Sequence, residues 1–111
     1  MTVSKKTDDL LSNVRILVVD DDHLLRSVLL EQLGFEGVKY FAEAATAAHV
    51  FTQIDAFMPD LILLDVQLPD GNGFEICARL RQSGFDKPIL MLTSQDDESD
   101  IIKGLEAGAN D

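Results

Sequence analysis

Polar side chains able to take part in catalysis directly follow three short apolar runs of the sequence. They are Asp20, Asp21, Asp22, Asp65, Thr93 and Ser94. Carboxylates held close together repel one another, and a hard cation such as Mg²⁺ relieves this repulsion while keeping several of its waters. A carboxylate beside Mg²⁺ can attack phosphorus, and a nearby hydroxyl can donate a hydrogen bond to a phosphoryl oxygen. These residue types therefore suit Mg²⁺-dependent transfer of a phosphoryl group.

The candidate side chains can meet only if the apolar runs before them are strands of one sheet. Runs rich in Val, Ile and Leu predict strands at residues 16–19, 38–42, 61–64 and 89–92. Apolar residues at helical spacing predict helices at residues 22–33, 44–57, 74–80 and 101–109. We expect Asp22 to cap the first helix and Gly34 to end it, and we expect Pro59 to end the second.

Strands that alternate with helices predict an α/β fold with a doubly wound parallel sheet. In such sheets ligands bind beyond the carboxyl ends of the strands, where the polar groups would converge. Asp65 stands alone at the end of a buried strand. It is therefore the candidate nucleophile.

The composition indicates one folded domain in a reducing compartment. The chain has 111 residues, 46% of them hydrophobic, and a formal net charge of −11. This acidic excess argues against direct binding of nucleic acid, because phosphate backbones are held by Lys and Arg. A single cysteine, Cys77, excludes an internal disulfide, and two histidines make no zinc pattern.

Targeting signals are missing from this sequence. Residues 1–13 are polar and without periodicity, so we expect a flexible lead before a domain at residues 14–111. No apolar run approaches the ~18 residues that a membrane span needs. We therefore expect a soluble, cytoplasmic protein with no membrane contact.

Other interpretations of the same residues remain. An acidic run after a strand can serve only as a solvated loop and helix cap. A calcium loop with its invariant glycine at Gly73 would place Leu68 and Arg79 at the first and last ligand positions, so that reading fails. The chain has no P-loop motif, and the acidic loop would repel a nucleotide or flavin phosphate. A haloacid-type phosphatase needs a second acid where this chain has Gln67.

Four motifs together carry a resemblance. They are ILVVDDD at residues 16–22, PDLILLDVQLPDGNG at 59–73, PILMLTS at 88–94 and AGAND at 107–111. The chain resembles the receiver domain of bacterial two-component response regulators over residues 14–111. The resemblance implies a flavodoxin-like sheet of order 2-1-3-4-5. It also implies that Asp65 is the phospho-acceptor, that Asp20, Asp21 and the backbone carbonyl of Gln67 help it to hold Mg²⁺, and that Thr93 is the switch hydroxyl.

The resemblance also implies partners. A sensor histidine kinase or a phosphotransfer protein would supply the phosphoryl group, and the chain would be an acceptor with at most slow self-dephosphorylation, not an enzyme. The family's fifth strand and helix would follow Asp111, so we expect a C-terminally truncated chain with four of five βα units. The fourth strand would then have an open edge, which favours a homodimer or strand-edge association. The alternative function is a non-phosphorylated module for interaction or dimerisation.

Overall fold

The computed structural model of the protein describes residues 11–92. Along the chain they form β1 (Arg15–Val19), α2 (His23–Phe35), β2 (Tyr40–Ala44), α3 (Ala47–Phe57), β3 (Leu61–Asp65), β4 (Gln67–Leu68), β5 (Gly71–Asn72), α4 (Gly73–Gln82) and β6 (Ile89–Leu92). The expected helix at residues 101–109 lies outside the described residues, as do Thr93 and Ser94.

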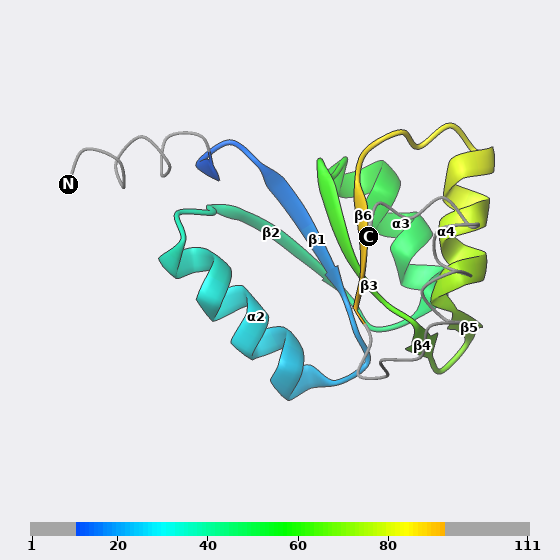
Figure 1. Cartoon of the computed structure of the whole chain (residues 1–111), viewed down its shortest axis with the longest axis horizontal. Helices are drawn as coiled ribbons and strands as arrows, with labels where there is room; N and C mark the ends of the chain where they lie inside the picture. The colour runs from blue at the N-terminus through cyan, green and yellow to red at the C-terminus, as the bar shows by residue number, and fades with distance from the viewer. Residues whose placement is uncertain (1–10, 93–111) are drawn as a thin grey trace.

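A parallel sheet forms the centre of the described part of the chain (Figure 1), with the strand order β2-β1-β3-β6. Val19 of β1 lies beside Ala44 of β2 and Leu64 of β3. Because the strands are parallel, their carboxyl ends share one edge of the sheet. This order confirms the first four positions of the expected arrangement and the α/β class.

Helices cover both faces of this sheet (Figure 1). α2 lies on one face, and α3 and α4 lie on the other. Leu17 and Val19 of β1 belong to the core on the α3 and α4 side, and Ile16 and Val18 belong to the core on the α2 side. Side chains alternate between the two faces of a strand, so burial on both faces explains why this apolar run has no polar position.

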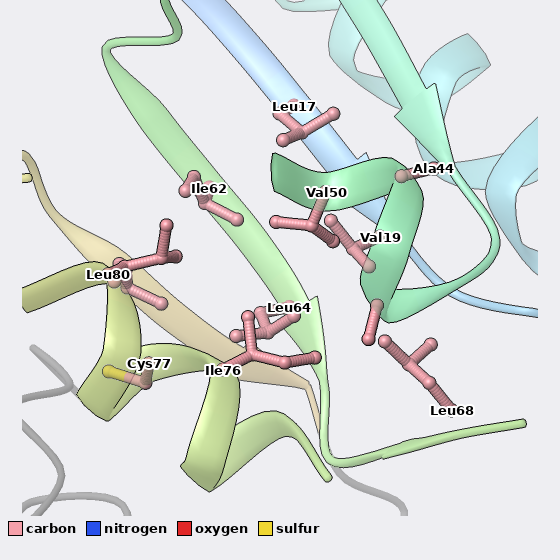
Figure 2. Close-up of a cluster of buried hydrophobic side chains, with 12 residues drawn as sticks. Leu17, Val19, Ala44, Val50, Ile62, Leu64, Leu68, Ile76, Cys77 and Leu80 are labelled. Atoms are coloured by element: carbon pink, nitrogen blue, oxygen red, sulfur yellow. The ribbon is translucent and has the colours of Figure 1, made fainter. Parts of the chain in front are cut away.

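The two cores are not equally sealed. Figure 2 shows the core under α3 and α4, with the labelled side chains Leu17, Val19, Ala44, Val50, Ile62, Leu64, Leu68, Ile76, Cys77 and Leu80. By contrast, no residue of α2 is fully buried, and Leu24 and Val28 are 76% and 52% exposed.

Leu11 packs against the α2-side core, so the packed part of the chain starts before Val14. Residues 1–10 of the expected flexible lead lie outside the described residues. No helix of the described part is long and apolar enough to cross a membrane.

The end of α2 differs from the expected one. The helix continues through Gly34 to Phe35, and the chain turns at Gly37, whose φ is 103°. A left-handed φ of this kind is the conformation that glycine adopts at least cost. The glycine at which the chain leaves the helix direction is therefore Gly37, three residues after the expected Gly34.

The segment between α2 and α3 is also shifted. β2 spans Tyr40–Ala44, not residues 38–42, because this stretch pairs with Arg15–Val19 of β1. α3 then starts at Ala47, not at residue 44, because the Thr46 hydroxyl accepts a hydrogen bond from the backbone N–H of His49 (3.2 Å). Thr46 therefore acts as the N-cap.

A small hairpin follows Asp65, between the predicted strand at residues 61–64 and the predicted helix at residues 74–80. Gln67 of β4 pairs with Asn72 of β5. The side chain of Leu68 is buried in the core and anchors the hairpin there. The Asn72 side chain accepts a hydrogen bond from the backbone N–H of Phe74 (2.7 Å), which caps α4 directly after the hairpin.

Candidate functional site

Three carboxylates meet at the carboxyl edge of the two central strands. Asp20 directly follows β1, Asp21 comes next, and Asp65 is the last residue of β3. One oxygen from each lies within 4.8 Å of the others. They face a hollow of about 600 Å³ that is also lined by Asp22, Leu25, Leu29, Met91 and Leu92. The structure thus brings together the acids that the sequence predicted to converge.

Asp20 is held at three points. Its backbone N–H donates to the carbonyl of Ala44 (3.1 Å), and its carboxylate accepts from the backbone N–H of Asp22 (2.9 Å). Its carbonyl accepts from Nη1 of Arg26 (2.6 Å). Asp20 is only 4% exposed, so these three hydrogen bonds replace bonds to water that its polar groups lose on burial.

Asp22 has a different role from its two neighbours. Its carboxylate accepts hydrogen bonds from the backbone N–H groups of Leu24 (3.0 Å) and Leu25 (3.2 Å). This confirms Asp22 as the N-cap of α2. The acidic run therefore divides into a helix cap and two carboxylates that join Asp65.

The carboxyl group of Asp65 is half-buried and electrostatically strained. Burial, and then the charges of Asp20 and Asp21, raise its pKa from the ordinary 3.8 to about 6. The backbone N–H of Gln67, which donates to Asp65 Oδ1 (3.4 Å), opposes part of this rise. Ionising Asp65 therefore costs free energy in the folded protein, and a bound cation would reduce this cost.

The donor set fits a hard divalent cation. In the described part of the chain, no ion pair joins a basic side chain to Asp20, Asp21 or Asp65. Carboxylate oxygens are the ligands that Mg²⁺ prefers, and an open corner leaves room for the waters it retains. Gln67 lies two residues after Asp65 at the start of β4. A metal contact by its carbonyl stays a prediction.

Gly73 packs against the backbone of Asp65 and Val66. Its N–H donates to the carbonyl of Val66 (2.6 Å), and a Cβ atom at this position would collide with the carbonyl oxygen of Asp65. Only glycine permits such close approach. Gly73 therefore lets the start of α4 lie directly against the backbone of Asp65 and Val66.

Two residues near the site were missed by sequence reasoning. Arg26 binds the Asp20 carbonyl, and Asp70 accepts from the backbone N–H groups of Ala47 (2.6 Å) and Ala48 (3.2 Å) at the start of α3. These two hydrogen bonds lower the pKa of Asp70. The only feature of the sequence that could have pointed to Asp70 is its place next to Gly71, and no local pattern distinguishes Arg26 from other basic residues.

Known proteins share both the sequence pattern and the fold. A family model described as response regulator receiver domain matches residues 16–111. Response regulator MprA of Mycobacterium bovis (strain BCG / Pasteur 1173P2) is 44% identical over 100 residues, which are 89% of this chain and 43% of that protein. The chain therefore spans less than half the length of this relative.

Solved structures agree with this match. The BeF3-activated N-terminal receiver domain of Klebsiella pneumoniae RstA superposes with a TM-score of 0.82 at 32% identity, covering 87% of this chain and 81% of that one. Chemotaxis response regulator CheY4 of Vibrio cholerae gives a TM-score of 0.80 at 28% identity, with 86% and 81% covered. With the family match extending over residues 16–111, this chain belongs to the response regulator receiver domain family.

Proposed function

We propose that the chain is a phospho-acceptor in two-component signalling and that Asp65 takes the phosphoryl group. The observation that carries the proposal is the cluster of Asp20, Asp21 and Asp65 at the carboxyl edge of the sheet in a chain of this family. Of the three, Asp65 is the last residue of the buried strand β3, and the resemblance to the family assigns the phospho-acceptor to this position.

In the proposed transfer, a carboxylate oxygen of Asp65 attacks the phosphorus of a phosphohistidine on a kinase or phosphotransfer protein. The new O–P bond forms as the P–N bond breaks, and the imidazole nitrogen keeps the electron pair and takes up a proton. Asp20, Asp21, Asp65 and the backbone carbonyl of Gln67 would hold Mg²⁺, which when bound neutralises charge on the transferring group. In this proposal Asp20 and Asp21 serve only to hold Mg²⁺, and Asp65 also forms the new bond to phosphorus.

The later steps rest on the resemblance. The hydroxyl of Thr93, which follows β6 in the sequence, would donate to the phosphoryl group and bias a two-state surface. The chain would then act as a stoichiometric acceptor in the cytoplasm, with at most slow self-dephosphorylation. With a net charge of −11, it would not itself bind nucleic acid.

Labelling with a small phosphodonor tests the acceptor. Wild type with Mg²⁺ should gain one phosphoryl group by intact-mass spectrometry, and Asp65→Asn should gain none, because the amide is not a nucleophile. Asp55→Asn is the matched control, since Asp55 lies exposed on α3. Equal labelling of wild type and Asp65→Asn would contradict the assignment of the nucleophile.

Mg²⁺ titration tests the site independently of the reaction. We expect weak binding, seen as backbone amide shifts at Asp20, Asp21 and Asp65, because the site is open and holds no phosphate to complete the shell. An absence of response up to about tens of millimolar, the range for such open sites, would favour the alternative function, a module for interaction alone.

The alternative function, in which the chain acts only by dimerisation, has a test of its own. Sedimentation at several concentrations measures self-association: this function requires a concentration-dependent dimer, and a strict monomer would contradict it.

A further inference from the structure

Arg26 connects three elements beside the acidic cluster. From α2, its Nη1 donates to the carbonyl oxygen of Asp20 (2.6 Å), and its Nε donates to Oε1 of Glu43 in β2 (3.0 Å). The Arg26 side chain is only 12% exposed. The backbone carbonyl of Glu43 in turn accepts from Nε2 of Gln53 in α3 (3.1 Å). Arg26 therefore links the end of β1 to α2 and to β2.

The contact made by Arg26 has a specific geometric meaning. The carbonyl of Asp20 belongs to the planar peptide unit that links the Cα atoms of Asp20 and Asp21. A donor to this carbonyl restricts rotation of the peptide unit, and with it the directions in which both side chains leave the backbone. Because the guanidinium bonds the carbonyl and Glu43, both carboxylates stay available to a cation.

We infer that Arg26 is a positioning residue of the acceptor site, which sets the directions of the Asp20 and Asp21 carboxylates through the peptide that joins them. This inference rests on the proposed function, in which these carboxylates hold Mg²⁺. Arg26 does not touch the cation or the phosphoryl group. It acts through the backbone of Asp20.

The direction in which Mg²⁺ affinity changes when Arg26 is replaced shows whether Arg26 acts by positioning the ligands or only by its charge. Removing a cation beside acids makes the local potential more negative, which by Coulomb's law tightens the binding of Mg²⁺. Releasing the Asp20–Asp21 peptide weakens binding, because the ligands are no longer held in place. Replacing Arg26 by a neutral residue therefore tightens Mg²⁺ binding if only its charge matters, and weakens Mg²⁺ binding if its positioning of the peptide matters.

The experiment measures the Mg²⁺ dissociation constant by amide shifts in wild type, Arg26→Gln, Arg26→Lys and Arg79→Gln. We expect Arg26→Gln to bind about 10-fold more weakly, in the range found when groups that orient metal ligands are removed. Arg26→Lys keeps the charge but lacks the planar fork, so its binding of Mg²⁺ should be weaker than that of wild type and stronger than that of Arg26→Gln. Arg79→Gln controls for loss of one positive charge, since Arg79 stacks on Phe51 on the other face of the sheet, and should bind as wild type.

Each outcome decides the inference. Equal or tighter binding by folded Arg26→Gln would overturn it and would leave the proposed function intact. If Arg26→Gln does not fold, Arg26→Lys decides, because pure charge predicts no change for it and positioning predicts weaker binding. If wild type neither binds Mg²⁺ nor becomes phosphorylated, the proposed function fails and the inference fails with it.

Discussion

Replacing Asp65 by Asn should stabilise the folded protein at neutral pH in the absence of divalent cations. Burial and the charges of Asp20 and Asp21 raise the pKa of Asp65 to about 6, so ionising this group is harder in the folded state than in the unfolded chain. Asn keeps the size of the side chain and an oxygen for the N–H of Gln67. It removes the charge, and with it the repulsion.

The size and pH range of the effect follow from linkage. Below the unfolded pKa near 3.8 both states are protonated, so wild type carries no penalty. As pH rises from about 3.8 to about 6, the unfolded chain releases this proton before the folded protein does, so wild type progressively loses stability relative to Asp65→Asn, and the loss is complete above the folded pKa. Because the carboxyl group is only half-buried, solvent screening reduces the unscreened value, and we expect a difference of about 1 kcal/mol at pH 7.5.

Urea unfolding with EDTA, followed by circular dichroism between pH 3.5 and 7.5, measures this difference. A gain of about 1 kcal/mol corresponds to a rise of roughly 4–8 °C in Tm for a domain of this size. Asp55→Asn, on the exposed face of α3, controls for the loss of one carboxylate far from the cluster. Its stability should lie within about 0.5 kcal/mol of wild type at pH 7.5, as for other exposed substitutions.

Two results would refute the reasoning. One is an Asp65→Asn variant that is no more stable than wild type at pH 7.5. The other is a stability gain of the same size at pH 3.5 and pH 7.5, which would trace it to packing and not to charge. Adding Mg²⁺ should narrow the difference at neutral pH, since a ligand that binds only the folded wild type stabilises it.

Three further outcomes can be measured with the same unfolding assay. Gly73→Ala should lose about 1–3 kcal/mol, because the added methyl group meets the carbonyl of Asp65. Ile62→Ala should lose about 2–5 kcal/mol, because Ile62 is fully buried between the layers. Asp70→Ala should lower the urea midpoint above pH 4, because α3 loses two hydrogen bonds, and its difference from wild type should vanish as pH falls through the lowered pKa of Asp70. A loss in Asp70→Ala that is independent of pH would contradict the last expectation.

The sheet and the acidic cluster could be predicted because both follow from local signals. A continuous apolar run such as residues 16–19 indicates a strand buried on both faces, and the parallel arrangement then brings strand ends together. Asp20 and Asp65 stand directly at such ends. The proximity of Asp20 and Asp65 could therefore be predicted without knowing how the side chains pack.

The remaining features depend on contacts between residues distant in sequence. β2 lies two residues later than expected because its register is set by pairing with β1, which its own sequence does not encode. Arg26 and Asp70 matter through bonds to Asp20 and to the start of α3, across 6 and 23 residues. A single sequence gives the type of such a side chain and not its partner.

The hydrogen bond between Gly73 and Val66 has a mechanical consequence. It joins the backbone next to Asp65 to the first residue of α4, a helix of 10 residues, with no slack for a side chain between them. At 1.5 Å per residue the helix is ~15 Å long, so a tilt of ~5° at its start moves its far end by ~1 Å. A shift of the Asp65 backbone would therefore tilt α4 about its first residue, and the displacement would be largest at the other end of the helix, near Ser83.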